Sequence, residues 1–374
     1  NYFNSGNPAT GANAAYDFSS HTVADGWTPY IGMFTGSGHN CYVNFGQFEL
    51  NSFSSNIPTG FATLSSANLP EPTIKLPNKH SDTVTYTGSG SGNQSITTLN
   101  FQPDWVWLKV RSTGGWHALV DSVRGVGKIL ASNEKDAENN SSDSQTAFSA
   151  FLSNGFTVGY NSSWYVNGTP SGSATQVAWN WNAGDADSKT YKVKVVADST
   201  DYGHGTGSNK YQFFKSDGTT GFGTNGVDLD LEEGGTYIFD WSDSSAQNHP
   251  IRFSLTNDGT HSSGTSAGTE YTTGVTKDDS AYKTTITIAS GVANLFYYCQ
   301  NHSGMGAEIN TNTTKGSTNF DGSTKSVVKA NTTAGFSIVT YTGQQNASDT
   351  IGHGLGVKPQ VVITKSRNST YTYT

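Results

Sequence analysis

The chain has 374 residues and a formal net charge of −8; only 13% of its residues are charged, whereas 12% are aromatic. The aromatic content argues against a disordered chain, and the negative charge leaves no basic stripe that would bind the phosphate backbone of a nucleic acid. No run reaches the roughly 18 apolar residues of a membrane span. Only Cys41 and Cys299 are present, too few and too far apart for a disulfide scaffold. We expect an all-β chain of short strands, arranged as tandem β-sandwich modules with Gly, Asn and Ser in the turns.

Four segments follow from the pattern along the chain. Residues 1–80 end in a linker that Pro58, Pro70 and Pro72 punctuate. Residues 81–187 contain the alternating strands "DWVWLKV" and "TQVAWNWNAG" and one helix or loop region, "SDSQTAFSAFLSNG". Residues 188–312 read as strands from "YKVKVV" to "NLFYYC", and residues 313–374 begin with a polar linker.

Part of the chain is repeated. "VTYTG" occurs at 84–88 and at 339–343, and "FQPDWVWLKVRS" at 101–112 is echoed by "VKPQVVITKSRN" at 357–368. The two offsets are 255 and 256 residues, so the register is kept over a whole segment. We therefore expect residues 313–374 to hold a linker and the start of a second copy of the 81–187 module, in a modular array that is open at its C-terminus.

A cluster of soft metal ligands lies in the third segment. His249 stands at the start of the strand "HPIRFS", and "YYCQNHSGMG" at 297–306 contains Cys299, His302 and Met305. Two imidazoles, a thiolate and a weak thioether are the ligands of a blue-copper centre. The alternative is that Cys299 is buried as a small apolar residue beside a Gly-rich turn. The order of the four residues on strand and loop favours a metal-binding fold, with copper as the candidate cofactor and its occupancy left open.

"GGTYIFDWSDSSAQNHPIRFS" followed by "YYCQNHSGMGAEI" resembles the cupredoxin family over roughly residues 190–310. The resemblance implies a Greek-key sandwich with His249, Cys299, His302 and Met305 as ligands. The spacing between His302 and Met305 is shorter than is usual in the electron-transfer members of the family, which affects Met305 most. His261, in "DGTHSSG", is a spare candidate with no matching family position.

The flanking segments resemble other modules. The end of residues 1–80 resembles the C-terminal part of a SPRY-like β-sandwich, and "LVDSVRG", "NGFTVG" and "VAWNW" resemble a lectin-like β-sandwich of tail-fibre-like structural proteins from aquatic bacteriophages. This resemblance implies an extracellular or virion-surface structural protein that is not an enzyme. Its partners would be copies of itself or other fibre subunits, and a host-surface glycan or protein. Trp116, Trp164 and Tyr165 are candidate carbohydrate contacts, with core packing as the alternative.

Two other classes of function stay open. One is a secreted copper protein that transfers electrons, with the other modules as anchors. The second is a subunit of a non-viral extracellular filament, glycosylated at N-x-Ser/Thr sequons such as Asn93, Asn140 and Asn368. "RGVGK" at 124–128 lacks the first Gly of a phosphate loop, and no nucleophile elbow is present, so the sequence supports no catalytic assignment.

Overall fold

The computed structural model describes residues 72, 74–259, 268–312 and 314–368. The chain divides into two compact units, residues 1–75 and 76–374, and the second contains almost all of the described residues. The SPRY-like interpretation of residues 1–80, apart from their last few positions, lies outside the described residues, as do Cys41 and His261. The described part is nearly all β, which confirms the prediction of tandem β-sandwiches.

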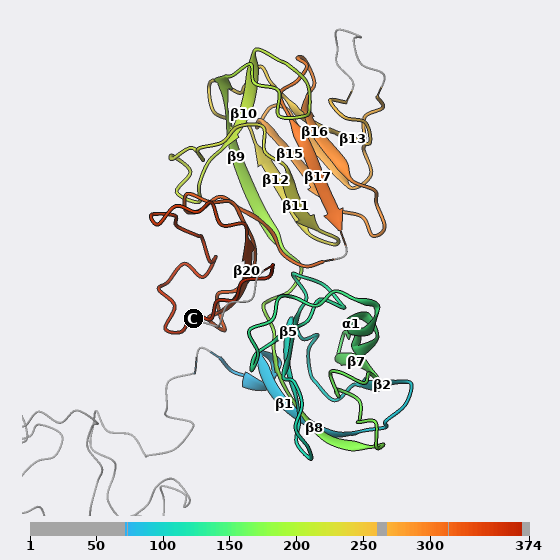
Figure 1. Ribbon diagram of the computed structural model, residues 1–374. Coiled ribbons are helices and arrows are strands. Elements are labelled where there is room, and N and C mark those ends of the chain that lie inside the picture. The colour runs from blue at the N-terminus through green and yellow to red at the C-terminus, as the bar shows by residue number, and fades with distance from the viewer. Residues whose placement is uncertain (1–71, 73, 260–267, 313, 369–374) are drawn as a thin grey trace, which may run out of the picture. The chain divides into compact units, whose positions relative to one another are not determined.

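The first sandwich is built from two antiparallel sheets (Figure 1). One sheet has the strand order β1 (Ser81–Gly88), β8 (Ala174–Trp181), β3 (Trp105–Val110), β4 (Ala118–Asp121) and β5 (Leu130–Ala131). The other has the order β2 (Asn93–Ile96), β7 (Gly155–Gly159) and β6 (Phe148–Leu152), with helix α1 (Ser142–Ala147) directly before β6. Successive side chains of a strand point to opposite faces. On β3, Val106, Leu108 and Val110 are therefore buried, whereas Trp105 and Trp107 are half-buried on the other face.

The second sandwich has a mixed topology. Its first sheet has the order β10 (Asn209–Phe213), β9 (Ser188–Ala197), β12 (Thr236–Asp240), β15 (Lys283–Thr287) and β14 (Val275–Asp278). Its second sheet has the order β11 (Leu229–Glu232), β17 (Ala307–Asn312), β16 (Leu295–Cys299) and β13 (Ile251–Ser254). The pairs β9–β12 and β11–β17 are parallel and the other pairs are antiparallel. The core is aromatic and includes Tyr191, Tyr211, Phe213, Tyr237, Phe239, Trp241 and Tyr297.

A three-stranded sheet follows, with β19 (Ser326–Asn331) between β18 (Ser317–Asn319) and β20 (Phe336–Tyr341). By the repeat offset β20 corresponds to β1, but β20 pairs with β19 whereas β1 pairs with β8. Residues 361–363, the counterpart of the first half of β3, are exposed and form no strand. In the first copy the corresponding strand, β3, bonds to β8 on one side and to β4 on the other.

Among the described residues, no helix has the length and the apolar character that crossing a membrane requires.

Candidate functional site

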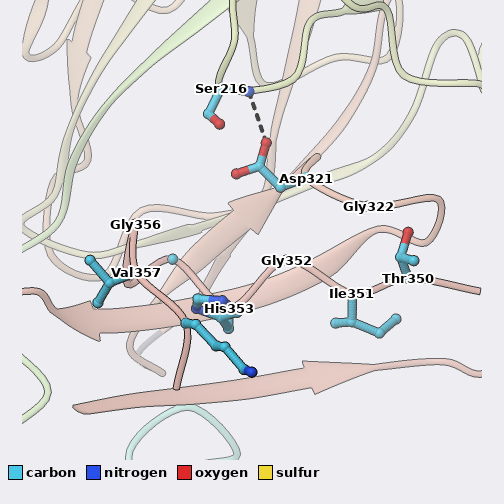
Figure 2. A pocket seen from close by; sticks show the side chains of 11 residues that line it. Ser216, Asp321, Gly322, Thr350, Ile351, Gly352, His353, Gly356 and Val357 are labelled. Carbon is cyan, nitrogen blue, oxygen red and sulfur yellow. Dashed lines mark hydrogen bonds between the residues drawn. The ribbon is translucent and has the colours of Figure 1, made fainter. Parts of the chain in front are cut away.

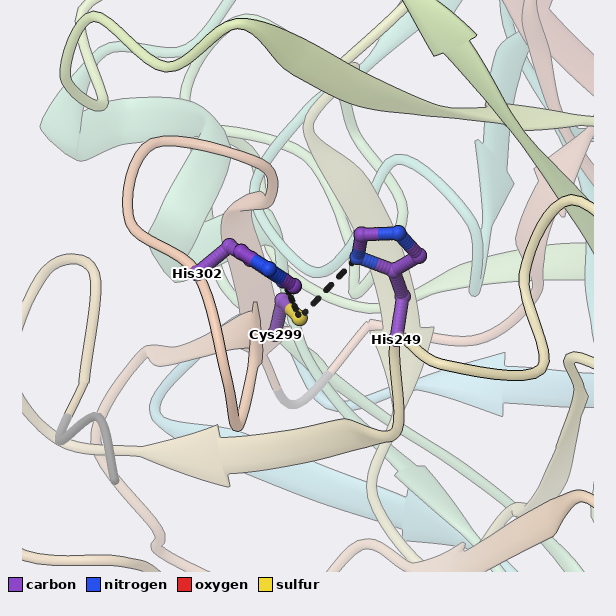
Figure 3. Close-up of side chains that lie close together, drawn as sticks. All are labelled: His249, Cys299 and His302. Carbon is purple, nitrogen blue, oxygen red and sulfur yellow. Dashed lines mark hydrogen bonds between the residues drawn. The ribbon is translucent and has the colours of Figure 1, made fainter. Parts of the chain in front are cut away.

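Three of the predicted metal ligands lie together at one end of the second sandwich (Figure 3). Cys299 is the last residue of β16, and His302 follows on the loop to β17. His249 lies in the turn that precedes β13. Because β13 and β16 are antiparallel neighbours with Ile251 opposite Cys299, the strand register brings residues 50 positions apart to the same edge.

The donor atoms are close enough to share one ion. The Nδ1 atoms of His249 and His302 each lie 3.6 Å from Sγ of Cys299, and the three donor atoms are all within 4.8 Å of one another. An ion bonded to both groups at usual lengths, about 2.0–2.1 Å to N and 2.3 Å to S, would separate N from S by about 3.5–3.8 Å. The two N–S distances therefore match those expected around a bound metal ion. Within the described ranges, this is the only group of three or more His, Cys, Asp or Glu side chains gathered in this way.

Backbone contacts connect the two segments that carry the ligands. Asn301 donates its side-chain amide to the Asn248 carbonyl at 3.0 Å, and its backbone N–H points to Sγ of Cys299 at 3.4 Å. The hydroxyl of Tyr211, which is buried in the core, donates to the His249 carbonyl at 2.7 Å. Protein contacts thus hold the ligand positions, a form of preorganisation.

Burial sets the protonation of the site. Burial raises the pKa of the Cys299 thiol, although the N–H of Asn301 that points to the sulfur acts in the opposite direction. Burial lowers the pKa of His249, and the neighbouring His302 lowers it further. A metal ion must therefore displace the proton of Cys299, whereas burial already favours the neutral imidazole that binds metals.

Met305 is buried in the same apolar core as Cys299. Its backbone carbonyl accepts the N–H of Tyr211 at 3.1 Å, and the preceding Gly304 donates its N–H to Asp258 at 2.8 Å. Lys210 also donates to the Gly304 carbonyl. The loop between β16 and β17 is therefore held on both sides. The role of Met305 as an axial ligand stays a prediction.

His204 belongs to no motif in the sequence, and the structure gives it two partners. Its Nε2 lies 2.9 Å from a carboxylate oxygen of Asp228, and its Nδ1 lies 3.0 Å from Oδ1 of Asn257. Both ring nitrogens are engaged, which assigns His204 to loop packing. The partners are 24 and 53 positions away, so no local sequence pattern pointed to them.

The three candidate carbohydrate contacts differ in exposure. Trp164 is only 3% exposed and belongs to the core of the first sandwich, so its prediction as a ligand contact is wrong. Its ring also packs edge-to-face against Trp116, with ring centroids 5.2 Å apart. Trp116 and Tyr165 are half-buried, and both line a cavity of about 490 Å³.

A second cavity, of about 650 Å³, lies beside the C-terminal segment (Figure 2). Glycines of residues 350–358 form much of its wall, together with His353, Lys358 and Asp321. One oxygen of Asp321 accepts the N–H of Ser216 at 2.9 Å, and the N–H of Leu355 points to His353. Two of the three titratable groups already have backbone partners, and the cavity does not gather a catalytic set.

Comparison with known proteins gives one match. No curated protein and no solved structure matches the chain. A family model matches residues 76–200 and 300–374, which is more than half of the chain. The stretch between the two matched ranges, residues 201–299, includes His249 and Cys299, whereas His302 and Met305 fall inside the match. The chain belongs to the family described as "Domain of unknown function (DUF7483)".

Proposed function

We propose that this chain is an extracellular structural and adhesion protein whose second sandwich binds a copper ion through His249, Cys299 and His302. The observation that supports the metal site is the approach of the three donor atoms to within 4.8 Å at the ends of two paired strands. A thiolate with two imidazoles is a donor set that suits copper, and a weak thioether from Met305 would complete a type-1-like site.

The ion would act mainly as a staple. When bound, copper supplies a cross-link between the turn before β13 and the loop after β16. A ligand that binds only the native state stabilises it by about 4 kcal/mol at a thousandfold excess over Kd. Such a staple suits a module that works outside the cell, where stability against unfolding matters more than turnover.

The test is titration of the metal-free protein with Cu(II) and, separately, with Zn(II). We expect intense visible absorption with Cu(II) only, a higher melting temperature with the bound ion, and loss of both effects in a Cys299→Ser variant. His353→Gln, which changes a histidine remote from the site, should behave as the unchanged protein. A colourless protein whose melting temperature does not respond to Cu(II) would refute the copper site.

The structural and adhesive role is supported by the tandem β-sandwiches and by the repeat at an offset of 255–256 residues. Repetition of modules raises avidity without a tight single site. We propose a tail fibre or comparable virion appendage as the setting, with copies of the chain or other fibre subunits and a host-surface glycan or protein as partners, and no enzymatic activity. Antibody labelling of the source particle under negative stain is the test. Label along a fibre supports the proposal, and label on a non-viral filament supports that alternative instead.

One observation favours electron transfer as a second candidate. His302 is exposed although Cys299 beside it is buried, so one ligand ring is accessible to a partner protein. Repeated reduction and reoxidation of the copper-loaded protein by a soluble donor and acceptor would support this role. A copper centre that absorbs visible light but cannot be cycled would exclude it and leave the staple.

A further inference from the structure

The cavity beside Trp116 has the size of a small-ligand site. Its volume of about 490 Å³ falls within the range of about 300–1,000 Å³ that is usual for such sites. Loops of the first sandwich form it, and its side chains come from three separate segments: Trp116, Asn133 with Glu134, and Ser162, Ser163 and Tyr165.

Two aromatic rings in this cavity are fixed in place. Trp116 packs edge-on against the buried ring of Trp164. Tyr165 has a φ of 53°, a conformation that bulky residues rarely adopt and that is concentrated at functional sites. The buried side chain of Gln176 donates to the Tyr165 carbonyl at 2.8 Å and supports this conformation. Gly115 lies so close that a Cβ there would be 3.2 Å from the Tyr165 ring.

The loop that carries Tyr165 is also preorganised. Oδ1 of Asn161, a buried residue, accepts the N–H groups of Ser163 and Trp164 at 2.8 and 3.0 Å. Its amide donates to the Asp143 carbonyl at 3.0 Å. The entropy of ordering this loop is therefore paid on folding rather than on binding a ligand, which favours affinity.

Polar groups surround the two rings. Oδ1 of Asn133 accepts the N–H of His117 at 2.8 Å, which fixes the amide at the cavity wall. Ser162 and Ser163 are exposed and offer hydroxyls, and Glu134 offers a carboxylate. None of the side chains that line the cavity is positively charged.

We propose that this cavity binds a neutral saccharide of one or two rings. The apolar C–H face of a sugar would lie on Trp116 and Tyr165, and its hydroxyls would bond to Asn133, Glu134 and the two serines. Glu134 and the lack of a lining cation disfavour uronic and sialic acids, because a second carboxylate would be repelled. The inference deepens the adhesive role proposed above and rests on it, since it names the class of host-surface ligand.

Saturation-transfer NMR on the full chain tests the proposal. The probes are the methyl glycosides of glucose, galactose, mannose and N-acetylglucosamine, with methyl glucuronide as the acidic counterpart. We expect transfer to the ring C–H protons of at least one neutral glycoside and little to the glucuronide. Glu134→Gln should raise transfer to the glucuronide, because it removes the repelling charge.

Two variants locate the binding site. Tyr165→Gly removes the ring and tolerates the positive φ, and Trp116→Leu keeps apolar volume against Trp164. Each should weaken binding about tenfold. Tyr341→Leu, which changes an exposed tyrosine outside the cavity, should leave binding unchanged. The melting temperature of each cavity variant shows whether it folds. If one of the two does not fold, the other one tests the location of the binding site.

Absence of transfer from every neutral glycoside, or full binding by both folded cavity variants, would overturn the proposal. Sugar binding that both variants lose supports it, even if the intact protein fails to attach to cells. A failure of the intact protein to attach to cells would count against the adhesive role alone. Copper binding is measured independently of both.

Discussion

At the scale of single residues, two buried tyrosines form a matched pair. The hydroxyl of Tyr211 donates to the His249 carbonyl at 2.7 Å, and that of Tyr297 donates to the Val227 carbonyl at 2.9 Å. Either change to Phe should lower the free energy of unfolding by about 1–2 kcal/mol, since a buried acceptor loses its donor. Only Tyr211→Phe should also weaken Cu(II) binding, by about tenfold, because it frees a ligand-bearing backbone segment. Equal copper affinities in the two variants would show that the Tyr211 hydroxyl does not help to position His249.

Asp104, also buried, makes the stability depend on pH. Its carboxylate accepts the hydroxyl of Ser122 at 2.7 Å and the N–H of Ala183 at 2.8 Å. Burial raises its pKa above 3.8, although the charge of Lys329 acts against this. A raised carboxyl pKa means that the fold binds the proton more tightly than the unfolded chain does. Its contribution to stability therefore rises as pH falls through the folded pKa, and reaches its full value below the unfolded one.

Asp104→Asn should therefore stabilise the protein at neutral pH, because the amide removes a charge whose burial is costly. The amide can still bond to both partners, since the Ser122 hydroxyl can donate or accept. The stability advantage over the unchanged protein should shrink as pH falls toward about 4. Urea unfolding at a series of pH values measures this, and a difference that is constant with pH would refute it.

At the scale of elements, an ion cluster secures the turn between β4 and β5. Nε of Arg124 lies 2.5 Å from Asp121, and Nη1 lies 2.9 Å from Glu138. The same guanidinium donates to the carbonyls of Leu119 and Lys128 at 3.0 Å each. Arg124 is 5% exposed and its two acidic partners are 7% and 9% exposed, so all three charges depend on the pairing.

Arg124→Met should cost about 3–5 kcal/mol, because it leaves the buried carboxylate of Asp121 without a cation and takes away the buried one of the two cations that pair with Glu138. Arg367→Met is the control. Arg367 also pairs with Glu138 at 2.9 Å, but it is 41% exposed, and its loss should cost less than about 1 kcal/mol. Chemical denaturation measures both. Similar losses in the two variants would show that burial does not set the strength of these pairs.

Local patterns predicted the elements better than the contacts between them. The alternation of "WVWLKV" predicted the strand that became β3, and the order of His249, Cys299 and His302 on strand and loop predicted a cluster whose donors do lie together. The burial of Trp164 could not be read from its polar neighbours, because it depends on a core drawn from distant segments, among them Leu108 and Phe148. The parallel pairing of β11 with β17 likewise joins segments about 80 residues apart, without a local signal.

At the scale of the whole described unit, one buried carboxylate joins three segments. Glu232, at the end of β11, accepts the N–H of Asp187 at 2.9 Å and the N–H of Gly316. Nζ of Lys329 on β19 lies 3.5 Å from Glu232 and donates to the Asp185 carbonyl at 2.7 Å. The end of the first sandwich, the second sandwich and the β18–β20 sheet therefore meet at a single ion pair, with both side chains buried.

Glu232→Gln and Lys329→Met should each cost about 3 kcal/mol or more, because each leaves a buried charge without its partner. The double variant should cost clearly less than the sum, since neither Glu232 nor Lys329 is then left as a charge without the other. Limited proteolysis supplies a second measurement. In the single variants the β18–β20 sheet should become cleavable before the second sandwich does, because its link to Glu232 is lost. Additive losses in the three variants, or proteolysis that begins in the second sandwich, would show that the ion pair does not join these segments.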